Sequence, residues 1–331
     1  MARRQALMAA PSGDFGLGPG LGLGIDAGGS RNRWALATPA GVIVAEGEAP
    51  GMAAQHMAHA DGRQALQAAF AGLCRAVLDA GRPRRVCAGL TGFDGAGAGA
   101  GDGTQARRWL ADLLALDGAA VTLCSDIHIA YLDSFQPGDG YLVYAGTGSI
   151  AAWIDPDGVL HRAGGRGVTL DDGGGGFWIA REALRQVWRA EDECPGSWTA
   201  SPLARALFAQ IGGSDWSLSR DLVYGGQRGA VGKLALAVAA AAASDPAANA
   251  ILRQAGVELA RLALALTARY GPRPVVLAGR ASTLHPAIAA AMRAALPASI
   301  PLAHRVAQPH HAAARIAAQI DTLTNKPTTK P

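Results

Sequence analysis

Residues Tyr141 to Ser149 read YLVYAGTGS, and this stretch decides the fold. Its apolar residues predict a short buried strand, which the turn Gly146-Thr147-Gly148-Ser149 then ends. Such a turn offers bare backbone N–H groups and two hydroxyls, which are suitable donors to a phosphate. Glycine and serine turns after strands are common, so the stretch becomes informative only if it recurs.

The chain contains a second stretch of the same kind. Residues Gly24 to Ser30, GIDAGGS, also form an apolar segment that runs into a glycine turn. A tryptophan follows each turn (Trp34 and Trp153), and a proline-containing turn follows each tryptophan (Pro39-Ala40-Gly41 and Pro156-Asp157-Gly158). This agreement in order, turn chemistry and spacing predicts an internal duplication.

Alternating and helical periodicities predict an α/β chain. We expect strands at Leu21–Ala27, Arg33–Thr38, Val42–Gly47, Arg85–Leu90, Val121–Cys124, Tyr141–Tyr144, Ala151–Ile154, Val159–Arg162 and Pro274–Ala278. We expect helices at Ala58–Ala80, Thr104–Leu116, Ile127–Phe135, Phe177–Ala190, Pro202–Gln210, Leu218–Tyr224, Ala230–Ala243, Asp245–Arg269, His285–Leu296 and Pro309–Ile320. The predicted units are a disordered leader (1–20), a first domain (21–135), a second domain (136–308) and a disordered tail (321–331); the helix 309–320 returns to the first domain.

Composition places the chain among soluble globular proteins. It has 331 residues, of which 50% are apolar and 17% charged, with a net charge of +4. No basic run with interleaved aromatic residues favours nucleic acid as a partner. The longest apolar run, Leu234–Ala243, is half of a membrane span and predicts a packed helix rather than a membrane partner. Residues 1–20 lack the pattern of a signal peptide, and the expected location is the cytoplasm.

The four cysteines and the histidines give no metal-binding pattern. Cys74, Cys87, Cys124 and Cys194 form no CxxC motif, and we expect buried free thiols. His304, His310 and His311 are predicted at the surface.

The two glycine turns and three acidic positions are the candidates for chemistry. Facing one another across a cleft, the turns could grip a polyphosphate, with hydroxyls from Ser30 and Thr147. Asp26 ends the first strand and could hold Mg²⁺ through water, or it could simply stabilise its turn. Asp126 follows a strand at a domain boundary, and either acts as a general base or caps the next helix. Asp171 and Asp172 precede four glycines, and either bind a substrate hydroxyl or are solvated acids on a flexible hinge.

With these motifs, the chain resembles the N-acetylglucosamine kinase group, within the BadF/BadG/BcrA/BcrD-type ATPases of the actin–hexokinase–Hsp70 superfamily. The likeness covers roughly residues 21–319. The matching segments are Gly24–Ser30 and Gly146–Ser149 (phosphate motifs), Ser125-Asp126 (catalytic Asp), Leu170–Ile179 (LDDGGGGFWI, similar to LGDEGSGxWI), Val276–Gly279 (VLAG, similar to the adenosine motif) and Pro309–Gln319 (final helix).

The resemblance implies two ribonuclease H-like domains with an ATP cleft between them, and an ATP- and Mg²⁺-dependent sugar kinase. It implies nucleotide binding by Gly28, Gly29, Ser30, Gly146, Thr147, Gly148, Gly279 and Arg280, with Asp26 as the metal partner. It implies Asp126 as the catalytic base, and sugar binding by Asp126, Ser149, Gly165, Arg166, Gly167 and Asp172. The sugar would be N-acetylglucosamine, glucosamine or a relative, and a homodimer is compatible with the sequence.

The sequence departs from the family mainly at the sugar pocket. The expected Asn after the third strand is missing from Gly51–His56, and Ile150 stands where GTGSN has Asn. Gly173 replaces the Glu of the GDEGS motif. Two other functions therefore stay open: an ATPase that activates a partner reductase through an iron–sulfur cluster, and a sugar or nucleotide sensor without turnover. The activator reading lacks a second cysteine in the Gly146–Ser149 region.

Overall fold

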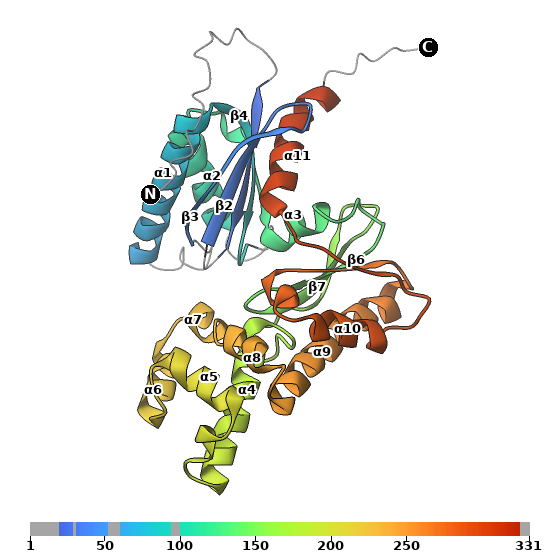
Figure 1. Cartoon of the computed structure of the whole chain (residues 1–331). Coiled ribbons are helices and arrows are strands. Elements are labelled where there is room, and N and C mark those ends of the chain that lie inside the picture. The colour runs from blue at the N-terminus through green and yellow to red at the C-terminus, as the bar shows by residue number, and fades with distance from the viewer. Residues whose placement is uncertain (1–19, 29–30, 52–59, 94–99, 325–331) are drawn as a thin grey trace, which may run out of the picture.

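The computed structural model describes residues 20–28, 31–51, 60–93 and 100–324 (Figure 1). It has two α/β halves, each built around a five-stranded sheet. The predicted leader, apart from Gly20, and residues 325–331 lie outside this description. The predicted tail is wrong at its start, because helix α11 (Pro309–Thr324) continues through residues 321–324. No glycine or proline interrupts the sequence between Pro309 and Thr324, so nothing there stops the helix.

The two sheets have the same topology, which confirms the duplication. In the first, β1 (Leu21–Ala27), β2 (Arg31–Ala37) and β3 (Ile43–Pro50) form an antiparallel meander, and β4 (Pro83–Leu90) and β5 (Val121–Ser125) continue parallel to β1. In the second, β6 (Tyr141–Ala145), β7 (Ser149–Ile154) and β8 (Leu160–Gly164) form the meander, and β9 (Val275–Ala278) and β10 (Leu302–His304) continue it. Strand β10 was not predicted, because three largely exposed residues carry no periodic signal.

Helices cover both faces of the first sheet (Figure 1). On one face, α1 (Ala60–Ala80) and α2 (Ala100–Leu114) pack on a core that includes Ile25, Phe70 and Leu110. On the other face lies α11, with Ala314 and Ala318 against alanines of β2. Glycines of β1 permit this close approach, since a Cβ at Gly24 would overlap the carbonyl oxygen of His310.

The final helix also corrects a prediction about its histidines. The side chains of His310 and His311 are 6% and 11% exposed, so they do not lie at the surface. Their place in the first turn of α11 puts them against the edge of the first sheet, where β3 contributes Glu46.

The second half has its own core. The long helix α9 (Pro246–Tyr270) packs on the second sheet and on α10 (Pro286–Ala295). Around α4 (Gly176–Glu193) lie the shorter helices α5 (Pro202–Ile211), α6 (Trp216–Arg220), α7 (Arg228–Gly232) and α8 (Ala235–Ala241). The predicted helix Leu218–Tyr224 is helical throughout, but it changes from α to π geometry at Asp221 and ends at Gly225. The predicted helix Ala230–Ala243 is broken into α7 and α8, and glycines at positions 229 and 232 disfavour continuous helix there.

Helix α3 (Asp126–Leu132) connects the halves. It contacts β4 of the first sheet as well as β6 and β7 of the second.

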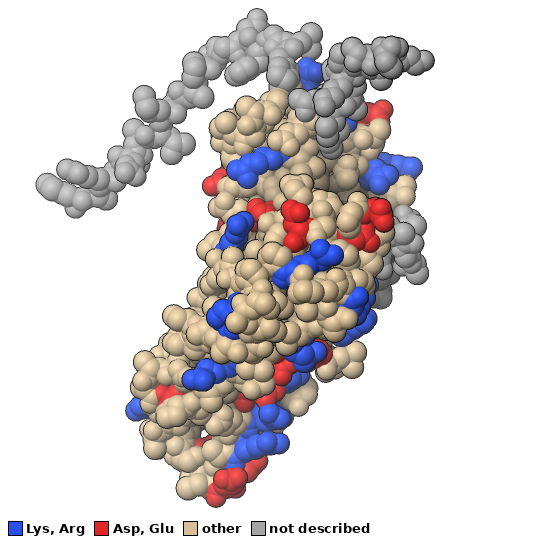
Figure 2. Space-filling view, turned by 90° about the vertical axis from the view of Figure 1, so that its right-hand side faces the viewer, with Lys and Arg blue, Asp and Glu red and all other residues tan. Residues whose placement is uncertain are grey.

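Among the described residues no single helix combines the length and apolarity needed to cross a membrane; Arg228–Ala241 and Pro246–Tyr270 reach that composition only as a pair bent by 119°. Acidic and basic side chains are interspersed over the face shown in Figure 2.

Candidate active site

Two carboxylates lie where the first sheet meets α3. Asp26 is the next-to-last residue of β1, paired with Arg33 on β2 and Gly89 on β4. Asp126 is the first residue of α3, and Ser125 caps that helix by accepting the N–H of His128 at 3.3 Å. The alternative that Asp126 is the cap is therefore wrong. Its Oδ1 accepts the N–H of Ile127 at 2.8 Å instead.

A glycine brings the two acids together. A Cβ at Gly89 would lie 3.1 Å from the Cα of Asp126 and 2.5 Å from Ile129 Cδ1, so only glycine lets α3 begin directly on β4. Burial, and then the charge of Asp126, raise the pKa of Asp26 to about 6; Arg33 and Arg280 act in the opposite direction. The two carboxylates therefore form an acidic pair whose charge is incompletely compensated.

The second half contributes groups that interact electrostatically with this pair. Burial, together with the charges of Asp26 and Asp126, raises the pKa of Tyr144 to about 12, while Arg33 and Arg280 act in the opposite direction. Arg280 is exposed on the turn after β9. The preceding Gly279 has φ of 95°, and a Cβ there would overlap Ala145, so glycine holds this turn against the end of β6. The predicted nucleotide residues Gly279 and Arg280 are thus adjacent to the Gly146 turn.

Hydrogen bonds from the first residues of α4 hold the Gly146–Gly148 turn in place. Within the turn, Gly146 N–H donates to the carbonyl of Gly148 at 2.8 Å. The carbonyls of Gly146 and Thr147 accept the N–H groups of Gly176 (2.8 Å) and Phe177 (2.9 Å), the first residues of α4. In the first half, Gly28 N–H donates to Arg31 at 3.2 Å, while Gly29 and Ser30 lie outside the described residues.

The predicted substrate loop is ordered around Asp172. This residue is buried, has φ of 51°, and is placed so that a Cβ at Gly148 would overlap its carboxylate. The N–H of Gly167 donates to its Oδ1 at 3.0 Å, and burial is the main cause that raises its pKa. The Ser149 hydroxyl donates to the carbonyl of Gly173 at 2.7 Å, and the Ser149 carbonyl accepts the N–H of Gly165 at 3.0 Å. Arg166 is exposed between these glycines.

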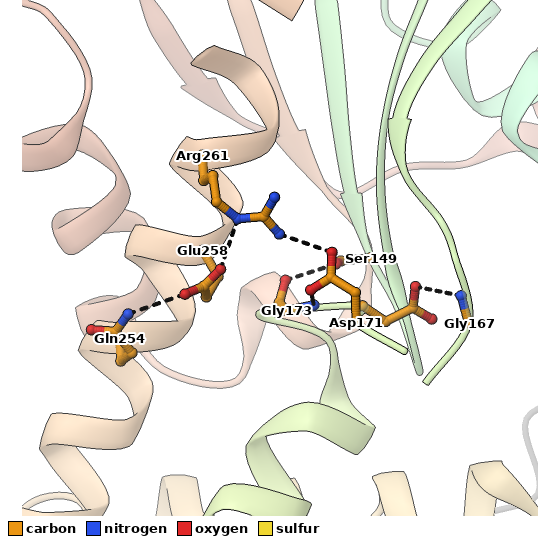
Figure 3. A network of polar contacts seen from close by, with 8 residues as sticks. Ser149, Gly167, Asp171, Gly173, Gln254, Glu258 and Arg261 are labelled. Atoms are coloured by element: carbon orange, nitrogen blue, oxygen red, sulfur yellow. Dashed lines mark hydrogen bonds and ion pairs between the residues drawn. The ribbon is translucent and has the colours of Figure 1, made fainter. Parts of the chain in front are cut away.

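The expectation of solvated acids is wrong for Asp172, which is buried. The side chain of Asp171 is partly exposed and pairs with Arg261 of α9 at 2.9 Å (Figure 3). Arg261 also bonds Glu258 at 2.9 Å, and Gln254 donates to Glu258 at 3.2 Å. A Cβ at Gly173 would lie 3.0 Å from Glu258 Oε2. The Glu258 carboxylate of α9 therefore occupies the space beside Gly173, which stands where the GDEGS motif has Glu.

The remaining sequence differences also have a place in the structure. Ile150 packs on Gly165, where a Cβ would lie 2.7 Å from Ile150 Cδ1. The segment without the expected Asn, residues 51–56, is described only at Gly51.

Cys194 is exposed, which corrects the expectation that all four thiols are buried. A separate surface hollow between α4 and α9, lined by Trp178, Gln186 and Gln254 among others, includes none of the predicted site residues.

Sequence reasoning missed three polar residues of this region. The Thr91 hydroxyl donates to Oδ2 of Asp126 at 2.6 Å, but Thr91 opens a glycine-rich segment without periodicity. Tyr144 was counted only as an apolar strand residue. Arg33 lies opposite Asp26 in the pairing of β1 and β2. Counting the strand register outward from the glycine turn could have predicted this position from the sequence.

A duplicated α/β lobe with a glycine turn after the first strand of each sheet defines the actin–hexokinase–Hsp70 class of ATPase fold. The model of the BadF/BadG/BcrA/BcrD ATPase family matches residues 23–314, so the chain belongs to this family.

The named relatives have low sequence identity to this chain. N-acetyl-D-glucosamine kinase from Dictyostelium discoideum is 31% identical over 110 residues, which are 33% of this chain and 33% of that protein. The match thus spans about a third of the relative. A candidate N-acetylglucosamine kinase structure from Chromobacterium violaceum is 27% identical, with a TM-score of 0.67 over 91% of this chain and 99% of its own. A ROK family glucokinase from Streptomyces griseus, in complex with glucose and AMPPNP, shares the fold (TM-score 0.55, 16% identity, 91% of this chain and 98% of its own).

Proposed function

We propose that this protein is an ATP-dependent kinase that phosphorylates a hydroxyl of an amino sugar, namely N-acetylglucosamine, glucosamine or a relative. The observation that carries the proposal is the Asp26–Asp126 pair, which interacts electrostatically with Tyr144 and Arg280 of the second half, both next to the Gly146–Gly148 turn in the fold. Membership of an ATPase family and the likeness to N-acetylglucosamine kinases support it.

The nucleotide would bind between the halves. The turn of Gly28, Gly29 and Ser30 on one side and the turn of Gly146, Thr147 and Gly148 on the other would hold its phosphates, with Gly279 and Arg280 beside the adenosine. Because the N–H groups of Gly28 and Gly146 are bonded within their own turns, Thr147 and Gly148 would be the donors on the second side. Asp26 fits a Mg²⁺ partner, because burial and then the charge of Asp126 disfavour its ionised form, which a divalent cation would stabilise. Bound Mg²⁺ would neutralise charge on the β- and γ-phosphates.

Asp126 would accept the proton of the sugar hydroxyl as the phosphoryl group is transferred. Thr91 and the N–H of Ile127 each donate to one carboxylate oxygen, which orients the group and leaves a further lone pair on each oxygen. Asp172, Ser149 and the segment Gly165–Gly167 would line the sugar side. Closure of the halves would exclude water and favour the sugar hydroxyl over hydrolysis.

A coupled assay of ADP release across amino sugars tests this function. We expect sugar-dependent release in the wild type, and a loss of at least about 100-fold in Asp126→Asn, because general-base catalysis contributes 10²–10⁴-fold. Asp157→Asn, an exposed turn residue of the second half, is the matched control and should keep wild-type turnover. Nucleotide binding without sugar-dependent release would contradict the proposal.

The same assay distinguishes the activator alternative. ADP release that is independent of sugar, from a protein that is brown after anaerobic preparation, would favour an ATPase that drives a partner reductase. In this structure Cys87 is buried between the first sheet and α11, with Cys124 packed against it. Tight nucleotide binding without any turnover would favour the sensor alternative.

A further inference from the structure

A cluster of three ligand-type side chains lies where α11 begins beside β3. Glu46 comes from β3, and His310 and His311 come from the first turn of α11. One donor atom of each residue lies within 4.8 Å of the other two. His311 Nε2 is 2.5 Å from Glu46 Oε2, and His310 Nε2 is 3.6 Å from the same oxygen.

The fold itself brings these residues together. Glu46 is opposite Ala35 in the register of β2 and β3, so both side chains point to the face that α11 covers. Gly24 lets the first turn of α11 settle on the central strand β1, and from there the two histidine side chains reach Glu46 on the edge strand β3. None of the three residues belongs to the predicted nucleotide or sugar set.

The state of His310 favours a ligand role. Its side chain is 6% exposed, and its Nε2 lies 3.6 Å from Glu46 Oε2, while Nδ1 on the other side of the ring is buried without a hydrogen-bond partner among the described residues. A neutral imidazole has a nitrogen lone pair to offer a cation, and Nε2 is the nitrogen of His310 that lies in the cluster.

We propose that Glu46, His310 and His311 form a binding site for a divalent transition-metal cation such as Zn²⁺. Two imidazoles and one carboxylate are a common set of protein ligands for zinc, and they leave one position open. Donor atoms about 2.1 Å from a tetrahedral cation lie roughly 3.4 Å apart, within the range of separations in this cluster. The short His311–Glu46 contact can lengthen by rotation of Glu46, whose side chain is 58% exposed.

Such a cation would tie the final helix to the edge strand of the first sheet. Because α11 follows the second sheet in the chain and packs on the first, the site would stabilise the return of the chain to the first half.

Zn²⁺ titration of chelator-treated, nucleotide-free protein tests the site by calorimetry and thermal unfolding. We expect one equivalent to bind with a rise in Tm, while Mg²⁺ at the same concentration gives none, since it prefers oxygen ligands. Glu46→Gln and His311→Asn should each weaken Zn²⁺ at least about tenfold. Glu48→Gln on the same strand and His285→Asn should bind like the wild type. Asp26→Asn should also keep Zn²⁺ binding, which separates this site from the nucleotide metal.

Two results would overturn the proposal. One is wild-type protein that binds no Zn²⁺ and gains no stability from it. The other is unchanged Zn²⁺ affinity in Glu46→Gln, an exposed substitution that should not disturb folding.

Discussion

The Thr91 hydroxyl donates a 2.6 Å hydrogen bond to Oδ2 of Asp126, so the residue that follows β4 holds the acid that begins α3. If Asp126 is the general base, Thr91→Val should lower kcat by about 10- to 100-fold, because a hydrogen bond to a charged group is worth about 1.5–3 kcal/mol. The Kd for nucleotide should change little. Steady-state kinetics and nucleotide titration would measure both.

The matched control for Thr91 is Thr122→Val on the neighbouring strand β5, where the side chain is exposed. This variant should retain the wild-type kcat. A Thr91→Val enzyme with unchanged kcat would show that the hydrogen bond does not contribute to catalysis.

The pKa of Asp26 predicts a pH-dependent stability. Its folded-state pKa of about 6 lies above the ordinary value of 3.8, so between these values the native state binds more protons than the unfolded state. Stability from this group is therefore present at low pH and is lost as pH rises through 6. Asp26→Asn should be more stable than the wild type above pH 6, by up to about 3 kcal/mol.

Thermal unfolding of nucleotide-free protein at pH 4.5 and 7.5 checks this expectation. The difference in Tm between Asp26→Asn and the wild type should grow with pH, whereas Asp157→Asn, an exposed acid, should track the wild type at both values. A difference in Tm that does not change with pH would mean that burial and the charge of Asp126 do not raise the pKa of Asp26.

The duplication and both glycine turns were predictable because turn chemistry is local. Glycines at 146 and 148 break an apolar run, and the same pattern recurs at Gly28, so the first strand and turn of each lobe follow from short stretches of sequence. The place of Asp126 between β5 and α3 also followed from the sequence, while the alternative that Asp126 caps α3 was wrong, because Ser125 caps it.

Residues recruited by tertiary contact were beyond sequence reasoning. Glu258 reaches Gly173 from a helix 85 positions further on, and His310 meets Glu46 only because α11 folds back over the first sheet. No spacing rule relates such positions. Helix ends and the three-residue strand β10 depend on neighbouring elements in the same way.

Gly148 has no room for a side chain, because a Cβ would overlap the Asp172 carboxylate. Gly148→Ala should therefore displace the substrate loop, lower the stability by about 1–3 kcal/mol and weaken sugar binding. Gly72→Ala in helix α1 is the control, since nothing lies within 4 Å of its Cβ position, and it should not lower Tm. Unchanged Tm in Gly148→Ala would contradict the packing of the loop on the turn.

Gly173 and Glu258 should be energetically coupled. Gly173→Glu, which restores the family's residue, places a Cβ 3.0 Å from Glu258 Oε2 and adds a like charge beside it, so the variant should unfold at a lower temperature. In a Glu258→Ala background both the space and the charge are relieved. The double-mutant cycle should then give a coupling of about 1 kcal/mol or more. The same cycle with Gln254→Ala, which contacts Glu258 from one turn away, should give a much smaller coupling. Additive effects of Gly173→Glu and Glu258→Ala would show that the α9 carboxylate does not occupy the place of the missing glutamate.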